Sequence, residues 1–346
     1  MKIGISTVCT FAVLSVFVSL RSSVAQVVPP GQENVIEQPT IASSDTVDGE
    51  NANSRCCDSP YGAAGLGCRP WWTVTAEALF LQRRSPAPAL LMTAGPAQDL
   101  DASSFRFDFH PGVDVSLAFQ ADSDNTLEVR YLGIDQWQAS TNTVTIPLTL
   151  LRINAAPPLF AFAGAAINAD YVSELHNFEI NGLHRMSDRW ALLAGFRYAE
   201  LDEHFQATLP GTLVTYDART RNRLCGFQLG GTAALWDRGG PLTVSGVGKG
   251  GIYGNQAAQD STFAFLPAPA NDKATPVAFL GEIGLTADYR LGEHLSVLGG
   301  YRLLWINGVA LATDQVAVSN FFTRSGINAS GDAFYHGAFL GLESQW

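Results

Sequence analysis

Residues 171–203 carry a strict alternation of apolar and polar side chains over two consecutive stretches. In the first stretch, Phe178 and Ile180 alternate with Asn177, Glu179 and Asn181. After a polar turn, the second stretch places one apolar set on a single face: Trp190, Leu192, Ala194, Phe196 and Tyr198. A two-residue period puts successive side chains on opposite faces of a β-strand. The segment therefore predicts two long strands joined by a tight turn.

The same pattern recurs along the chain and predicts ten strands. They span residues 72–82, 105–120, 125–137, 171–185, 189–201, 222–236, 241–253, 275–290, 294–306 and 332–346. Short polar turns (121–124, 186–188, 237–240 and 291–293) alternate with long connections (83–104, 138–170, 202–221, 254–274 and 307–331). Both ends of the strand series lie on the short-turn side, which is typical of outer-membrane barrels.

The predicted fold class is therefore all-β: an antiparallel up-and-down transmembrane β-barrel of about ten strands, within a range of about 8–12. A closed barrel is required because lipid offers no partner for the free backbone groups of an open sheet edge. A soluble barrel with its apolar face inward is the alternative, and periodicity alone does not separate the two. The loop asymmetry, the terminal Trp346 and the positions of the tryptophans favour the membrane barrel.

The first 70 residues differ from the rest. Residues 1–25 combine Lys2, an apolar run and a small-residue end, which predicts a signal peptide cleaved near Ala25. Loss of Lys2 and Arg21 with this segment changes the formal net charge from −11 to −13, which argues against a nucleic-acid partner. Residues 26–70 are predicted to be a disordered leader, and 71–346 the barrel.

The leader contains three cysteines: Cys56, Cys57 and Cys68. In an exported protein they favour a disulfide over a zinc site, because no histidine lies nearby to complete a ligand set. Which of them pair stays open, since three cysteines leave one over.

The strand parity also predicts which side chains face lipid and which face the lumen. The predicted lipid-facing set is Phe105, Phe107, Val113, Val115, Leu117, Phe119, Leu127, Val129, Tyr131, Phe279, Ile283, Leu285, Tyr289, Leu295, Val297, Tyr301 and Leu303. The predicted lumen charges are Glu77, Arg106, Asp108, Asp114, Glu128, Arg130, Glu179, Arg197, Lys249, Glu282, Asp288, Arg302 and Glu343. A charge facing lipid at mid-bilayer costs about 2–4 kcal/mol, so this sorting is what a membrane barrel requires.

All seven tryptophans lie at or beside predicted strand ends. The predicted interface aromatics are Trp72, Trp137, Trp190, Trp236, Trp305 and Trp346. An indole at the membrane interface buries its ring while its N–H bonds to headgroups. Trp346 also ends an amphipathic last strand, which resembles the signal read by the barrel-assembly machinery, although Ser344 is polar where such signals prefer an apolar residue.

Several of these segments resemble one known family. Residues 72–81, 171–181, 195–203, 299–312 and 334–346 are similar to those of the type-seven β-barrel porin family of planctomycete bacteria. The resemblance covers roughly residues 71–346. It implies an outer-membrane barrel and, more weakly, a porin; it carries over no catalytic or ligand residue.

Four patterns in the sequence are candidate chemical sites. Asp108, His110 and Asp114 share a face, but Pro111 and Gly112 between them predict a bulge, so structural polar groups are the better interpretation. His176 and His184 fit interfacial positions. The run 202–204 fits a solvated loop better than a cation site, and residues 246–251 lack the spacing of a phosphate-binding loop.

The sequence therefore predicts an exported outer-membrane protein with no cofactor and no enzymatic activity. Its expected partners are outer-membrane lipid and the barrel-assembly machinery, and its oligomeric state is not indicated. Three functions follow: a narrow porin-like channel for small solutes, a filled barrel that anchors or displays five external loops, or, third, an outer-membrane hydrolase. A barrel of about eight strands is just filled by side chains, whereas open channels appear near 16–18 strands. A ten-strand barrel therefore favours the narrow channel and the filled barrel to nearly the same degree.

Overall fold

A computed structural model describes residues 70–94, 99–142, 149–163, 167–210 and 213–346. The predicted signal peptide, nearly all of the leader and its three cysteines lie outside these ranges.

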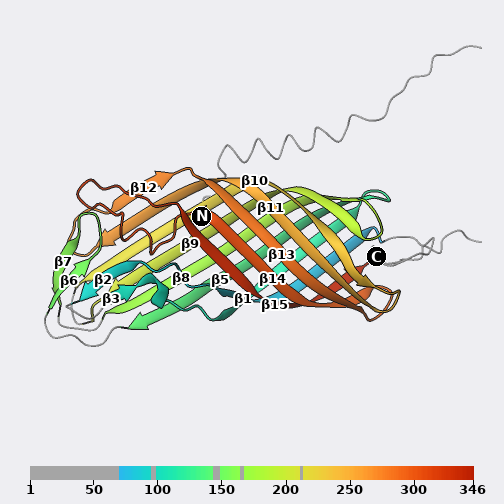
Figure 1. The fold of residues 1–346 in the computed structure, drawn as a ribbon, viewed down its shortest axis with the longest axis horizontal. Helices are drawn as coiled ribbons and strands as arrows, with labels where there is room; N and C mark the ends of the chain where they lie inside the picture. Colours follow the sequence, from blue (N-terminus) through green and yellow to red (C-terminus); the bar gives the residue numbers. More distant parts are fainter. Residues whose placement is uncertain (1–69, 95–98, 143–148, 164–166, 211–212) are drawn as a thin grey trace, which may run out of the picture. The chain divides into compact units, whose positions relative to one another are not determined.

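Among the described residues, ten strands close into one antiparallel barrel (Figure 1). They are β1 (Trp72–Arg83), β4 (Phe109–Gln120), β5 (Asn125–Asn142), β8 (Asn168–Arg185), β9 (Trp190–Thr208), β10 (Thr215–Asp237), β11 (Leu242–Phe263), β13 (Val277–Arg290), β14 (Leu295–Val309) and β15 (Gly331–Gln345). Each pairs with the next along the chain. The predicted fold class is confirmed.

The first and last strands close the barrel. β1 and β15 pair antiparallel from Thr73 opposite Gln345 to Arg83 opposite Tyr335. At the turn side, the Trp72 N–H donates to the Trp346 carbonyl (3.0 Å) and the Trp346 N–H donates to the Trp72 carbonyl (3.1 Å). The C-terminal strand thus closes the predicted barrel against the first strand.

On the loop side, two predicted long connections are largely strand. β9 and β10 continue to Thr208 and from Thr215, and β11 continues to Phe263. The apolar–polar alternation ends early in these strands because their outward residues become polar beyond lipid. Their inward residues stay buried, however, as Phe205, Ala207 and Tyr216 do, and this burial sustains the pairing.

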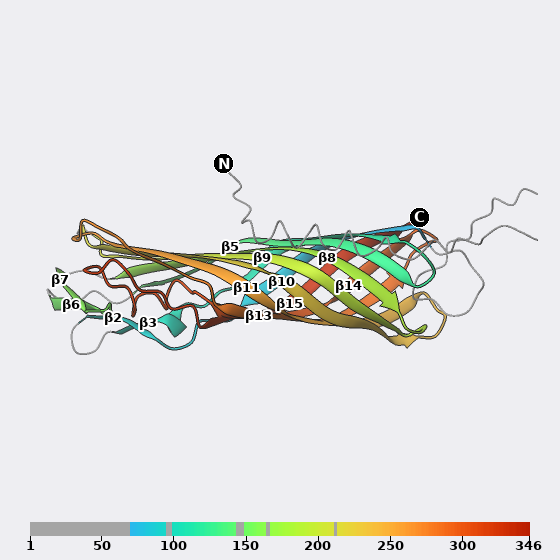
Figure 2. The ribbon, with the colours of Figure 1, turned by 90° about the horizontal axis from the view of Figure 1, so that it is seen from above.

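A second, four-stranded sheet has the order β3-β2-β6-β7. It comprises β2 (Leu90–Ala94), β3 (Asp99–Asp101), β6 (Thr149–Ile153) and β7 (Leu159–Ala163), and a short 3-10 helix, Ala102–Ser104, follows β3. Both ribbon views show it at the end of the barrel far from the C-terminus (Figures 1 and 2). β12 (Ala270–Ala274) pairs with the loop-side part of β11. Within the described ranges, no helix is long and apolar enough to cross a membrane.

Large apolar side chains cover the outside of the barrel. Leu229 is 70% exposed and Ile252 is 69% exposed, values that fit side chains in contact with lipid rather than with a protein core. Most of the predicted lipid-facing positions behave the same way, including Val113, Val115 and Ile283. The polar residues of the same strands alternate with them and point into the lumen.

The prediction was wrong just before β4. Phe105 and Phe107 are buried, and Arg106 and Asp108 are exposed, the reverse of what was expected for all four. The barrel strand begins only at Phe109, so the parity of β4 does not extend to these residues. They belong to the loop-side segment, where apolar side chains turn inward; Phe105 packs edge-on against Tyr171, with ring centroids 5.6 Å apart.

Trp137 is the second correction. It is 1% exposed, and its indole N–H donates to the Leu81 carbonyl (3.0 Å), so it is not at the membrane interface. A bulge in β5 between Ile134 and Trp137, with Gln136 at φ 54°, adds one residue to the strand. One extra residue reverses the facing of everything beyond it.

The other predicted interface tryptophans lie on the outer surface. Trp72, Trp190, Trp236 and Trp346 are 38–63% exposed and stand at the turn-side ends of their strands. Trp305 is half-buried because its ring lies across Gly281, where a Cβ would come within 2.3 Å of the ring.

The closing strand generates a first prediction. Deletion of residues 335–346 exposes two sheet edges and should abolish membrane insertion. Trp346→Ala keeps the strand and should slow assembly without changing the fold of the molecules that insert. Heat-modifiable gel mobility of membrane fractions over time measures both. A compact, heat-shifted band from the truncated chain would contradict the closing role.

The alternation of short turns and long connections generates a second prediction, on the orientation of the barrel in the membrane. An epitope tag inserted after Pro267, in the exposed turn between β11 and β12, should bind antibody on intact cells. The same tag after Ser187, in the turn between β8 and β9, should bind only after permeabilisation. The opposite result would reverse the orientation of the barrel.

Candidate functional site

The lumen is the candidate site, and its middle is occupied by charged side chains. Eight of the predicted lumen charges meet there: Glu77, Asp114, Arg130, Glu179, Arg197, Lys249, Glu282 and Arg302. We call this set the lumen network. It contains four acidic and four basic groups, each from a different strand, so the formal charges cancel.

Several pairs in the network cross the lumen rather than join neighbouring strands. Arg130 on β5 and Glu282 on β13 stand on opposite sides of the ten-strand ring, yet Arg130 Nη1 and Glu282 Oε1 are 2.8 Å apart. Lys249 Nζ on β11 lies 2.8 Å from Glu179 Oε2 on β8. Such ion pairs therefore lie across the lumen at this height.

Glu179 and Arg197 were predicted to face inward on adjacent strands, and the register places them directly opposite each other. Arg197 Nη2 lies 3.4 Å from Glu179 Oε1 and 3.1 Å from Glu282 Oε2. Both Glu179 and Arg197 are fully buried. Removing one partner of such a pair costs about 3–5 kcal/mol, because the other charge is left buried and uncompensated.

Amide side chains that were not among the predicted site residues complete the network. Gln228 Nε2 donates to Glu179 Oε2 (2.6 Å), and Asn177 Oδ1 accepts from Arg197 Nε (2.6 Å). Asn181 Nδ2 donates to Glu179 and to Glu128. Their inward parity was a usable signal, but uncharged amides do not stand out from the polar residues of a strand.

Above the network, toward the loop side, the lumen is apolar. Its inward side chains are all buried and include Leu79, Leu81, Leu132, Ile134, Leu175, Leu224, Leu280, Leu304 and Phe339. This apolar layer is a second obstruction of the lumen, after the lumen network.

On the loop side of the apolar layer lies another buried ion pair, separate from the lumen network. Arg83 pairs with Glu203, and the Tyr171 hydroxyl donates to Glu203 Oε2 (2.5 Å). The Arg83 guanidinium also lies 4.7 Å from the ring centroid of Phe107. Arg83 had been predicted to start a loop, and Glu203 to belong to a solvated one; both are buried inside the barrel.

Residues 310–330, between β14 and β15, fold into the loop-side end of the lumen; we call them the plug segment. The Ala312 N–H donates to Glu203 Oε2 (2.9 Å), and the Ala310 N–H donates to Asn222 Oδ1 (2.7 Å). Gln259 Nε2 donates to the Gly326 carbonyl (2.6 Å). Strand side chains thus hold the segment in place by its backbone.

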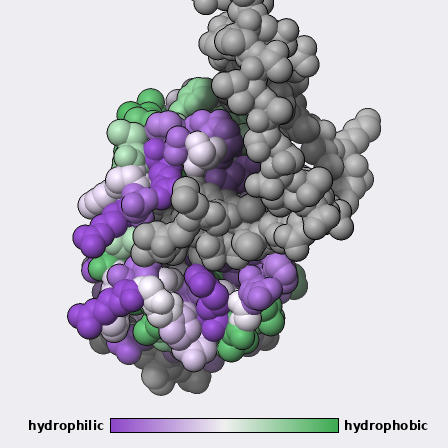
Figure 3. Space-filling model, turned by 90° about the vertical axis from the view of Figure 1, so that its right-hand side faces the viewer, coloured by the Kyte–Doolittle hydropathy of each residue, from purple (hydrophilic) through white to green (hydrophobic). Residues whose placement is uncertain are grey.

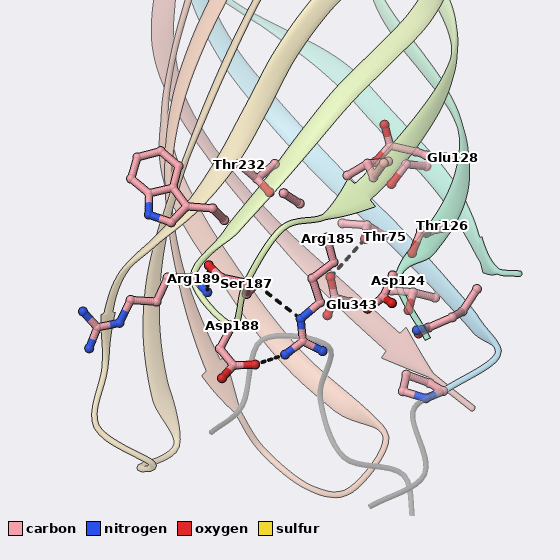
Figure 4. Close-up of a pocket in the computed structure, with 18 residues that line it drawn as sticks. Thr75, Asp124, Thr126, Glu128, Arg185, Ser187, Asp188, Arg189, Thr232 and Glu343 are labelled. Atoms are coloured by element: carbon pink, nitrogen blue, oxygen red, sulfur yellow. Dashed lines mark hydrogen bonds and ion pairs between the residues drawn. The ribbon is translucent and has the colours of Figure 1, made fainter. Parts of the chain in front are cut away.

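Below the network, a polar vestibule opens to the turn side (Figure 4). Its inner part has a volume of about 190 Å³, and the network forms its end wall through Arg130 and Arg302. It is lined by Glu128, Asp288 and Glu343, the predicted lumen charges that lie inside the barrel but outside the network. In the end-on view, hydrophilic residues occupy much of this face and hydrophobic ones lie toward its margins (Figure 3). The vestibule ends at the network.

The structure does not assemble the chemical sites weighed from sequence. Asp114 pairs with Arg130 inside the barrel while Asp108 is exposed outside it. In 202–204, Glu203 points inward and its two neighbours outward. Residues 246–251 lie within β11. No group of three histidine, cysteine or acidic side chains suited to a metal occurs among the described residues.

The plug segment contains one carboxyl with an altered acidity. Burial raises the pKa of Asp314 to about 6, the negative charges of Glu203 and Asp332 act in the same direction, and Arg83 opposes them. The folded state therefore binds this proton more tightly than the unfolded state. The stabilisation is present below about pH 4 and is lost as pH rises to about 6.

We expect Asp314→Asn to remove this dependence. At pH 7.5 the plug segment should be cut more slowly by protease in the variant than in the unaltered protein, and near pH 4 the two should be cut alike. Asp99→Asn, which removes an exposed carboxylate on β3, is the control. Equal protection of Asp314→Asn and the unaltered protein at pH 7.5 would contradict the assignment.

No family model and no curated protein matches the chain. Solved structures do resemble it in fold. The outer membrane protease OmpT of Escherichia coli has a TM-score of 0.48 and 9% identity, covering 80% of this chain and 96% of that one. The translocator domain of autotransporter NalP from Neisseria meningitidis has a TM-score of 0.42 and 11% identity, covering 80% and 88%. The toluene transporter TodX of P. putida has a TM-score of 0.29 and 8% identity, covering 79% and 88%. With its closed ten-strand ladder and apolar outer surface, this chain is an outer-membrane β-barrel protein.

Proposed function

We propose that the protein is a filled, non-conducting barrel that anchors and displays its loop-side structure at the cell surface. The observation that carries this proposal is the Arg130–Glu282 ion pair across the full width of the lumen. The apolar layer and the plug segment support it, since each obstructs the lumen at a different height. The porin-like channel, which the sequence placed first with the filled barrel as a close alternative, requires the ion pair, the apolar layer and the plug segment all to move.

The amount of structure on the loop side also favours display. The second sheet, β12, the plug segment and the ends of β8–β11 all lie there. The turns on the opposite side are only a few residues long, as between β4 and β5. A barrel whose only task was to conduct would not require an ordered sheet and a plug at one end.

The family likeness of residues 71–346 stays a proposal. If the chain belongs to the planctomycete type-seven family, then "porin" describes the architecture of these barrels and not an open lumen in this one. A hydrolytic activity is not part of the proposal, because no observation in the lumen favours it.

Planar-bilayer recording of the purified protein tests the proposal. The unaltered barrel should show no channel steps. Arg130→Ala combined with Glu282→Ala removes the cross-lumen pair without changing net charge, and a short Gly-Ser linker in place of residues 310–330 removes the plug. Neither change alone should produce channel steps, because each leaves the apolar layer and the other obstruction in place.

Arg185→Ala with Asp188→Ala is the matched control, since it removes one base and one acid from an exposed turn. Each variant must keep its heat-modifiable mobility to be scored. Large, regular conductance in the unaltered protein would refute the filled barrel and establish the channel.

A further inference from the structure

Three arginines form a column on the outer face of β10: Arg219, Arg221 and Arg223 alternate along the strand. Farther along the same face come Phe227 and Leu229, which are 58% and 70% exposed and face lipid. Arg223 lies four residues from Phe227, about 13 Å along the strand and about 10 Å along the membrane normal at a 40° tilt. The column therefore begins where hydrocarbon ends and rises through the headgroup layer.

The upper part of this column borders a groove of about 600 Å³ on the outer wall. Two cross-strand rows form its floor. One row runs Glu174–Asp202–Arg221–Ala258 and the next runs Val172–His204–Arg219–Asp260, across β8, β9, β10 and β11. Ala258 beside Arg221 is the smallest side chain of its row, and it leaves room next to the guanidinium.

The arginines are held from one side only. Arg221 bonds through Nε to Asp202 (3.0 and 3.2 Å), and Arg219 Nε lies 3.2 Å from Asp217 Oδ1. Asp217 also holds Nε2 of His204. The terminal amino groups of Arg219 and Arg221 have no hydrogen-bond partner among the described residues, and the two side chains are 66% and 56% exposed. The carboxylates thus orient the guanidinium groups, and their remaining donors stay available to the groove.

We propose that this groove binds the phosphorylated headgroup of an outer-leaflet glycolipid. Planar guanidinium groups with free terminal donors suit a phosphate, which accepts two parallel hydrogen bonds from each. The groove lies at headgroup level, so a lipid bound there can place its acyl chains against Phe227 and Leu229. This inference does not depend on whether the lumen conducts.

Two carboxylates at the margins of the groove narrow the choice of headgroup. Glu174 and Asp260 line it, and neither pairs with a base among the described residues. They repel a bare anion, but they accept hydrogen bonds from hydroxyl or amino groups. A phosphate attached to an amino sugar provides both kinds of group, so a phosphorylated amino-sugar headgroup fits better than free phosphate.

The test measures binding to the purified, detergent-solubilised barrel by native mass spectrometry. The probes are a diglucosamine bisphosphate glycolipid (lipid A), its dephosphorylated form and inorganic phosphate. The unaltered protein should retain the bisphosphate form and release the other two. Arg219→Gln with Arg221→Gln should weaken retention by about tenfold or more. Ala258→Trp, which fills the groove and leaves every charge in place, should do the same.

Arg152→Gln with Arg324→Gln is the matched control, because it removes two exposed arginines from the same side of the membrane. If this control weakens retention as much as the groove variants do, general attraction explains the binding and the site is refuted. Retention of inorganic phosphate alone would show an anion site and not a lipid site. Retention that neither groove variant changes would also overturn the proposal, provided that both keep their heat-modifiable mobility.

Discussion

Backbone hydrogen bonding in lipid is the constraint on which the rest of this structure depends. Each N–H and C=O within the hydrocarbon layer must find a partner in the protein, so the sheet must close. The pairing of β1 with β15 meets that requirement, and the reciprocal bonds between Trp72 and Trp346 complete it at the turn side. Closure in turn divides every strand into a lipid face and a lumen face.

The narrow lumen then determines what the inward polar groups can do. Ten strands bring opposite walls close enough for Arg130 and Glu282 to meet directly. Buried charges are costly unless each is paired and hydrogen-bonded, and the equal numbers of acids and bases in the lumen network satisfy that condition. The apolar layer and the plug segment then remove water from the loop-side half, where Arg83 and Glu203 pair in the same way.

Sequence reasoning succeeded where a side chain's facing follows from local parity. Glu179 and Arg197 were placed inward because each alternates with apolar neighbours, and the strand geometry alone requires that result. It failed at Trp137 because one bulge residue reverses parity, and nothing in the letters around Gln136 marks the bulge. It failed at Phe105 and Phe107 because beyond the membrane an apolar side chain no longer has lipid to face, and the filled lumen takes it instead.

The sequence by itself determined the fold class, the order of the strands, the side on which long connections lie and most of the inward charges. All of these depend on a two-residue period and on turn residues, which are local properties. Only the tertiary structure decided which charges meet across the lumen, that residues 310–330 enter it, and that the strands of 202–221 continue beyond lipid. Those outcomes depend on the stagger and diameter of the closed barrel, which bring together residues far apart in the chain and leave no trace in any single strand.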